Sequence, residues 1–317
     1  NYGAEILRLW VAGEDYRDNI RLSTEILQRL TEAYRRIRNT CRYLIGNLHD
    51  FHPAENRIPY NEMEELDRFA LHRLQELCRT VLKAYDDFEF HLIYHSLHNF
   101  CVLDLSSFYL DIIKDRIYTS AADSKKRRSA QTAMNEILET LARLMAPILS
   151  FTADELWSFM PEDPERPASV HADMFIPVKE EFIDPELASR WEVLLLVRKE
   201  VSRALETARK EKRIGHSLDA VVTLGCSKEL LDQLTAYRED LRSIFIVSSV
   251  EIKTADQLEG VVETENFPGL KIFIEPSGDS KCERCWVHDP NVGSNPDYPT
   301  ICLRCIEAMK EQDGKGR

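Results

Sequence analysis

Apolar side chains recur every three or four positions through most of the first 160 residues, which is the spacing of α-helices with one buried face. A short helix is expected at the start, and Ser23 is placed to cap a long second helix. Thr152 and Glu155 have the spacing of a capping box before a last helix. Further helices are expected over about 64–85, 88–113 and 130–144. The pattern predicts a mainly α protein whose first domain, residues 1–160, is an all-α helical bundle.

The polar and apolar pattern changes after residue 160. Five prolines between positions 161 and 185 predict an extended connection over residues 161–184 that wraps over the bundle. Residues 185–277 are expected to form a small α+β domain. Its expected elements are a helix over about 185–212, strands over 220–224, 243–247, 250–253 and 270–275, and a helix over 230–241.

Two Cys-x-x-Cys pairs follow, separated by sixteen residues, and they carry the strongest chemical signal in the chain. Cys282, Cys285, Cys302 and Cys305 have the spacing at which four thiolates bind one Zn²⁺ ion tetrahedrally. Four sulfur ligands leave no position open for water, so the metal is expected to be structural. We therefore expect a C-terminal four-cysteine zinc module over residues 278–310, followed by a polar tail over 311–317.

Composition narrows the possible classes of function. The 317 residues have a net charge of −13, which argues against general adhesion to nucleic acid and restricts any such contact to local sites. No apolar run is long enough to cross a membrane, and no export signal is visible at the start. Cys41, Cys78 and Cys101 fall on apolar helical faces, and Cys226 is isolated, as expected in a reducing cytoplasm. The chain also starts inside an apparent helix without Met, so we expect it to be part of a longer protein.

Basic side chains gather on two expected helices. Arg35, Arg38, Asn39 and Arg42 share one face of the long second helix, because residues three and four apart are neighbours. This face either is simply solvated or contacts phosphate groups. A second basic ridge occupies the later half of the 185–212 helix, and residues 124–129 are expected to form a basic loop.

Motifs for an active site are missing. There is no phosphate-binding loop, no dinucleotide fingerprint and no nucleophile elbow. His91, His95 and His98 would lie on one helical face, but their apolar neighbours favour a packed interior over a metal site. We therefore assign no catalytic residue.

Five stretches resemble the C-terminal half of bacterial isoleucyl-tRNA synthetase, a class I family. They are NYGAEILRLWVAGEDYRDNIRLS, YRRIRNTCRYLIGNL, HNFCVLDLSSFYLDIIKDRIY, LMAPILSFTADELW and the terminal CERCW and CLRC pairs. The resemblance covers essentially the whole chain. The first four stretches are shared loosely with the valyl and leucyl relatives, whereas the four-cysteine module after an α+β domain is similar to the bacterial isoleucyl enzymes.

The resemblance implies an anticodon-binding bundle, a junction domain and a terminal zinc module with one structural Zn²⁺ per chain. The catalytic and editing domains would lie upstream, so this part alone is expected to be inactive, and ATP and isoleucine would bind only to the parent enzyme. The implied partners are the anticodon stem-loop of isoleucine tRNA and those upstream domains. The parent is expected to be a cytoplasmic monomer that does not bind membranes and that serves protein biosynthesis.

The residues between and just after the cysteines have two possible roles. Arg284, Arg304 and Lys281 would neutralise the four thiolates around zinc, or an arginine and the aromatic Trp286 would contact an unpaired loop base. The family places anticodon contacts at the positions that match Arg284 and Trp286. It also binds the anticodon stem and loop on its helical face, which favours Arg35, Arg38, Asn39 and Arg42 as further tRNA contacts.

Two other classes of function fit parts of this sequence. The chain would be a zinc-containing helical module that binds proteins without tRNA specificity if its binding to a protein partner were independent of salt. It would be an independent enzyme if it catalysed isoleucine-dependent exchange between ATP and pyrophosphate.

Overall fold

The computed structural model describes residues 2–258, 261 and 263–314. The chain divides into two compact units. The first contains Asn1–Asp111 and Asp123–Pro185, and the second contains Ile112–Ala122 and Glu186–Arg317. Positions 315–317 of the expected polar tail lie outside the described residues, and positions 311–314 belong to a helix.

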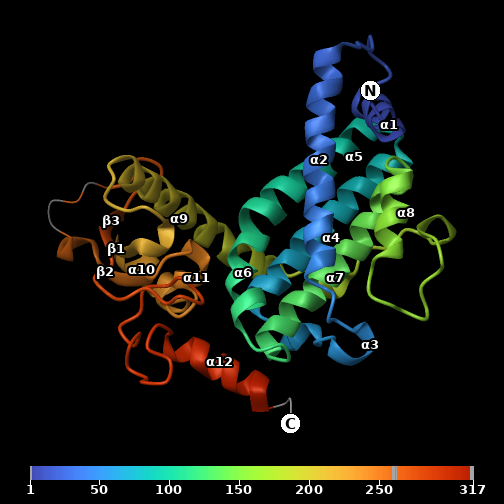
Figure 1. The fold of residues 1–317 in the computed structure, drawn as a ribbon. Helices are drawn as coiled ribbons and strands as arrows, with labels where there is room; N and C mark the ends of the chain where they lie inside the picture. The colour runs from blue at the N-terminus through green and yellow to red at the C-terminus, as the bar shows by residue number, and fades with distance from the viewer. Residues whose placement is uncertain (1, 259–260, 262, 315–317) are drawn as a thin grey trace. The chain divides into compact units, whose positions relative to one another are not determined.

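The first unit is a helical bundle (Figure 1). Its central helix is α7, Lys125–Met145, which contacts α2, α4 and α8 and is buried along almost its whole length. The helix is as polar in sequence as its neighbours, so burial on every side places polar side chains such as Ser129 and Gln131 in the interior. The surrounding helices are α1 Ala4–Gly13, α2 Thr24–Gly46, the short α3 Pro53–Asn56, α4 Glu65–Asp86, α5 Phe90–Asn99 and α8 Ser150–Ser158, with a 3₁₀ turn, η1 Tyr60–Glu62.

The helix expected over 88–113 is interrupted by a wider turn. Between α5 and α6, Leu110–Thr119, the segment η2, Phe100–Tyr109, is a π-helix, and the amide of Leu110 donates to the carbonyl of Leu105. A π-helix adds residues to each turn and so changes which side chains share a face. The apolar residues Phe100, Cys101, Leu105, Phe108 and Tyr109 are all buried as a result.

The cap at Ser23 is confirmed, because its side chain accepts a hydrogen bond from the amide of Ile26 at 3.2 Å. The expected capping box before the last helix of the bundle is wrong. The Thr152 hydroxyl instead bonds to that of Tyr34 at 2.9 Å, and Glu155 pairs with Arg38. Both side chains therefore link α8 to α2 rather than capping α8.

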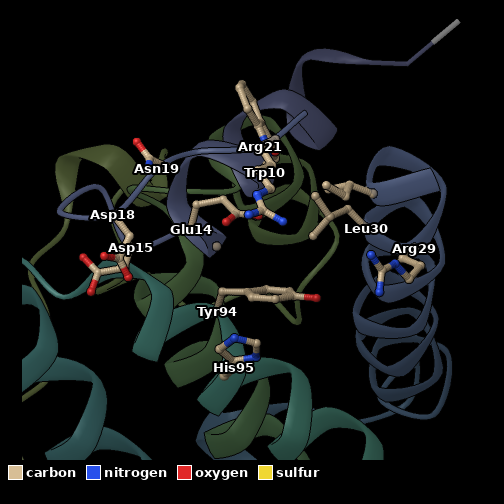
Figure 2. A pocket seen from close by; sticks show the side chains of 12 residues that line it. Trp10, Glu14, Asp15, Asp18, Asn19, Arg21, Arg29, Leu30, Tyr94 and His95 are labelled. Atoms are coloured by element: carbon tan, nitrogen blue, oxygen red, sulfur yellow. Dashed lines mark hydrogen bonds between the residues drawn. The ribbon is translucent and has the colours of Figure 1, made fainter. Parts of the chain in front are cut away.

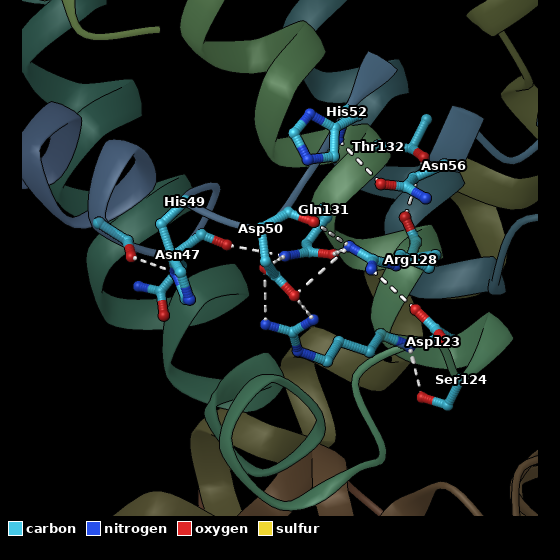
Figure 3. A network of polar contacts seen from close by, with 12 residues as sticks. Asn47, His49, Asp50, His52, Asn56, Asp123, Ser124, Arg128, Gln131 and Thr132 are labelled. Atoms are coloured by element: carbon cyan, nitrogen blue, oxygen red, sulfur yellow. Dashed lines mark hydrogen bonds and ion pairs between the residues drawn. The ribbon is translucent and has the colours of Figure 1, made fainter. Parts of the chain in front are cut away.

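The basic loop expected over 124–129 is also wrong, because α7 starts at Lys125 and Ser124 caps it. Arg127 and Arg128 are almost fully buried in this helix and lie against Asp50, at 2.6 and 3.5 Å. Figure 3 shows the network around Asp50, in which the Gln131 amide also donates to this carboxylate, at 2.8 Å. A partly buried carboxylate distant in the sequence thus neutralises charges that look exposed along the chain.

The connection over 161–184 has no α-helix or strand and lies against the bundle. It contains two 3₁₀ turns, η3 Val170–Ala172 and η4 Glu180–Phe182. The amide of Lys179 donates to Oε1 of Gln75 at 2.8 Å, and the amide of Asp184 donates to Nδ1 of His72 at 3.0 Å. Backbone groups that would be satisfied by secondary structure are satisfied here by side chains of the bundle.

The second unit contains a three-stranded sheet in the order β2-β1-β3. The central strand β1, Ala220–Cys226, pairs in parallel with β2, Ser249–Thr254, and antiparallel with β3, Leu270–Pro276. Gly225 is required in β1, because a Cβ there would lie 2.6 Å from Cδ1 of Leu258. The unit also contains α9 Pro185–Lys210, α10 Lys228–Thr235, α11 Leu241–Phe245, α12 Leu303–Gly314 and the 3₁₀ turns η5 Ser217–Asp219 and η6 Ala255–Gln257.

One expected strand of this unit is wrong. Residues 243–247 do not pair into the sheet, and most of them belong to α11, where Leu241, Ile244 and Phe245 are buried at helical spacing. Short apolar runs do not distinguish a strand from a buried helical turn. No helix in the described part of the chain is long and apolar enough to cross a membrane.

Candidate functional site

The four paired cysteines converge on one point in the second unit. The sulfur atoms of Cys282, Cys285, Cys302 and Cys305 all lie within 4.8 Å of one another. The Sγ atoms of Cys285 and Cys302 are 3.8 Å apart. Tetrahedral zinc with bonds of about 2.3 Å places its sulfur ligands about 3.8 Å apart, so this spacing fits the metal.

Backbone hydrogen bonds form the turns that aim the sulfur atoms inward. In the first pair the amide of Trp286 donates to the carbonyl of Cys282 at 2.8 Å, and the amide of Cys282 donates to that of Val287 at 2.9 Å. The turn holds Trp286 at a φ of 65°, a left-handed conformation that is uncommon for a bulky side chain. In the second pair Cys302 precedes α12, and Cys305 lies in its first turn.

Hydrogen bonding among the thiols shifts their pKa values in opposite directions. A hydrogen bond from the neighbouring Cys305 thiol, opposed by burial and helped by Arg304, lowers the pKa of Cys285 to about 4. The same hydrogen bond raises the pKa of Cys305. Zinc binding requires the thiolate form, and an ion bound by four thiolates has no free position for a reacting water. The site is therefore suited to holding structure.

Each cysteine pair carries an arginine directly before its second cysteine, and both side chains are partly buried. Nη1 of Arg284 donates to the backbone carbonyl of Thr119 at 2.5 Å. Arg304 binds both carboxylate oxygens of Asp115, with Nη2 2.9 Å from Oδ1. Burial raises the pKa of Asp115, but hydrogen bonds from Arg304 and Thr119 leave it below its usual value. Sequence reasoning missed Asp115 and Thr119, although they are one helical turn apart.

Trp286 is exposed beside this centre, with 57% of its surface accessible. Nζ of Lys281 lies 5.9 Å from the centre of its ring, within the range of a cation–π interaction. A large apolar ring held in solvent beside a cation is an arrangement that stacks on unpaired nucleotide bases.

The four residues predicted as tRNA contacts on α2 are all exposed. Arg35 pairs with Glu32 at 2.7 Å, and Arg38 pairs with Glu155 at 2.7 Å. Arg42 and Asn39 have no side-chain hydrogen bond or ion pair with any described residue. These four residues belong to the first unit, and the cysteines belong to the second.

Other candidates are less suited to binding. Much of the second basic ridge is paired within its own helix, as in Arg203 with Glu200 and Arg209 with Glu206. Among the described residues, the four cysteines form the single group of metal-binding side chains found, and His91, His95 and His98 do not form another. The remaining cysteines, Cys41, Cys78, Cys101 and Cys226, are buried, and burial raises the pKa of each thiol.

A cavity of about 810 Å³ lies in the first unit, where Trp10 and Tyr94 face it (Figure 2). Its shape depends on Gly13, because a Cβ there would lie 3.2 Å from the Tyr94 ring. Its charges are mixed, since Glu14, Asp15, Asp18, Arg21 and Arg29 all line it. This mixture does not favour a polyanion over other ligands.

Comparison with known proteins gives the family context of these sites. Residues 67–224 match the anticodon-binding domain of tRNA ligases, and residues 279–308 match a zinc finger found in FPG and IleRS. The match at 279–308 contains all four cysteines. The anticodon-binding match favours tRNA binding over the alternative of a protein-binding module without tRNA specificity.

Comparison with individual proteins also shows similarity to tRNA ligases. Isoleucine–tRNA ligase of Syntrophotalea carbinolica is 52% identical over 98% of this chain, and that of Geobacter sulfurreducens is 51% identical over 98%. The chain spans about 33% of each of these relatives. A solved structure of LeuRS from Agrobacterium radiobacter K84, in a ternary complex with tRNA and LeuAMS, aligns with a TM-score of 0.42 at 14% identity. That alignment covers 76% of this chain and 26% of the LeuRS chain.

Two findings support the same family. The identity to these relatives extends along nearly the whole chain, and the matched zinc finger contains all four cysteines. The chain belongs to the isoleucine–tRNA ligase family and contains the anticodon-binding and zinc-finger regions of its members.

Proposed function

We propose that this chain recognises the anticodon stem-loop of isoleucine tRNA and positions that tRNA for aminoacylation by the rest of the parent enzyme. The observation that carries the proposal is the exposed Trp286 ring, which the turn of a four-cysteine zinc site holds beside Lys281. Single-stranded loop bases are recognised by stacking on aromatic rings and by hydrogen bonds to their edges. Trp286 would supply the stacking, and Arg284, whose Nη1 donates to the carbonyl of Thr119, would supply hydrogen bonds from its remaining N–H groups.

The bundle would supply contacts that do not depend on the base sequence. Arg35, Arg38, Asn39 and Arg42 are exposed on one face of α2, where they would meet the phosphate backbone of the anticodon stem. Arg42 is the strongest candidate, because it has no ion pair among the described residues. Affinity and specificity would then depend on different parts of the chain.

The proposal extends to the parent protein. Isoleucine and ATP would react in a catalytic domain outside this chain, and this part alone would be inactive. The domain division proposed is a bundle over 1–160, a connection over 161–184, a junction domain over 185–277 and a zinc module over 278–310. The parent would act as a monomer in the cytoplasm, and the buried, reduced state of Cys41, Cys78, Cys101 and Cys226 supports that compartment.

The decisive experiment is a titration of this chain with isoleucine tRNA and with the same tRNA carrying a changed anticodon. It is run at two salt concentrations, with and without a chelator. We expect the cognate tRNA to bind more tightly, and we expect chelation to reduce the difference between the two RNAs. Equal binding of both RNAs at each salt concentration would contradict anticodon recognition.

A further inference from the structure

The two arginines of the zinc site reach the same turn of one helix. Arg284 and Arg304 occupy equivalent places in the motifs Cys-Glu-Arg-Cys and Cys-Leu-Arg-Cys. Arg284 donates to the carbonyl of Thr119, and Arg304 binds the carboxylate of Asp115. Asp115 and Thr119 lie one turn apart at the end of α6, and the Thr119 hydroxyl donates to Oδ1 of Asp115 at 3.1 Å. All four residues belong to the second unit.

This turn of α6 is well suited to bind two cations. The last carbonyl groups of a helix have no partner within the helix and carry partial negative charge. Asp115 adds a full negative charge at the same place. Both arginine side chains are partly buried, so these contacts are less screened by solvent than a pair on an open surface.

The same arginines also lie beside the sulfur ligands, because each directly precedes the second cysteine of its pair. Each arginine therefore links a metal-binding turn to the end of α6. Groups that contact a metal ligand without binding the metal orient that ligand and contribute to metal affinity.

We propose that Arg284 and Arg304 form a clamp through which zinc binding fixes the last turn of α6 to the zinc module. Zinc holds the two cysteine pairs at one separation, and this separation lets both arginines reach Thr119 and Asp115 together. Without the metal the two cysteine pairs are free to move apart. The contacts of Arg284 with Thr119 and of Arg304 with Asp115 then no longer form together.

The test is hydrogen exchange of the whole chain, with zinc and with a chelator, followed in residues 112–122 and 279–308. In the unaltered protein we expect chelation to speed exchange in both segments. In Asp115→Asn with zinc bound, we expect faster exchange in 112–122, protection retained in most of 279–308, and little further change in 112–122 on chelation. Unchanged exchange in 112–122 when the unaltered protein loses zinc would overturn the clamp.

Zinc affinity provides a second measurement, made by competition with a chromophoric chelator. We expect Arg304→Gln to weaken zinc binding about 10-fold, the lower end of the effect of losing a group behind a metal ligand. Arg304→Lys keeps the charge and should recover part of this loss. Arg209→Gln is the matched control, because it removes an arginine that pairs with a carboxylate outside the zinc module. Equal zinc affinity in Arg304→Gln and Arg209→Gln would also contradict the proposal.

These experiments distinguish failure of the clamp proposal from failure of the proposed tRNA recognition, on which the role of Trp286 rests. Exchange and zinc affinity are measured without RNA, so they test the clamp whether or not the chain binds tRNA. Trp286→Ala leaves both arginines in place and should change neither measurement. A variant at Arg284 affects both properties, so Trp286 and Arg304 are the informative positions.

Discussion

Arg38 on α2 lies against Glu155 on α8, with its Nη2 atom 2.8 and 2.7 Å from the two carboxylate oxygens. Both side chains are about half exposed, so the pair contributes little to stability, of the order of 0.2–1 kcal/mol. Its larger effect is on charge, since a phosphate group must compete with Glu155 for Arg38. Arg42, one turn further along α2, has no such competitor among the described residues.

The first prediction concerns this difference between Arg42 and Arg38. Arg42→Gln should weaken binding of all tRNAs to a similar degree and make the dependence of log K on log salt shallower by about 1, because one phosphate contact is lost. Arg38→Gln should have a smaller effect. Glu155→Gln should strengthen binding, because it releases Arg38. Binding is measured by titration over a range of salt concentrations, and an unchanged slope in Arg42→Gln would place α2 outside the RNA contact.

The second prediction concerns base recognition by Trp286. Trp286→Ala should weaken binding of the cognate tRNA by about 1–3 kcal/mol, the contribution of one stacked base, and should reduce the preference for the cognate anticodon. The fold and bound zinc should be retained, because the ring is largely in solvent. Phe273→Ala is a matched control, since Phe273 is an exposed aromatic residue of the same unit. If both variants discriminated between anticodons equally well, Trp286 would not read the RNA.

The third prediction concerns removal of zinc. The four cysteines form a small cluster, and among the described residues only Val292 and Ile301 pack against it as further apolar side chains, so the module has little apolar core of its own. Structural zinc sites of this kind contribute directly to folding. Chelation should therefore loosen residues 279–308, seen as faster hydrogen exchange, and leave the α2, α4 and α7 amides of the bundle protected. Loss of protection in those three helices would show that the bundle depends on the metal.

The fourth prediction concerns the partly buried carboxylate of Asp50. Burial raises its pKa, but hydrogen bonds from Arg127 and Gln131 outweigh this effect and lower the pKa from 3.8 to about 2. Because the folded value lies below the unfolded value, the stabilisation is complete above about pH 4 and is lost as the pH falls toward 2. The full shift corresponds to about 2 kcal/mol, and partial solvent exposure reduces it to about 1 kcal/mol.

Denaturant unfolding of the chain between pH 2 and pH 7 measures this contribution. Asp50→Asn should flatten the acid limb of the profile and lower stability at pH 7 by about 1 kcal/mol, because Arg127 and Arg128 lose the charge of a partly exposed partner. Glu62→Gln, which removes the exposed partner of Lys125, is the control and should change little. Equal pH profiles for Asp50→Asn and the unaltered chain would rule out this role of Asp50.

The sequence alone determined the helices with a clear buried face and the grouping of the four cysteines. Ser23 and the apolar stripe of α2 are local features, and a cap or a helical period is read from residues a few positions apart. The spacing of the cysteine pairs is equally local, so all four expected ligands meet in the structure. Resemblance to a family supplied the functional context, which spacing alone does not contain.

Only the tertiary structure decided which charges are available and which are used internally. Arg127 and Arg128 look like an exposed basic loop in the sequence, but they are buried because Asp50, 77 and 78 positions away, faces them. Arg304 finds Asp115 across 189 positions, and Arg284 finds the carbonyl of Thr119 across 165. A side chain pairs with the groups that the tertiary structure places next to it. Partners that are distant in the sequence cannot be predicted from a local pattern.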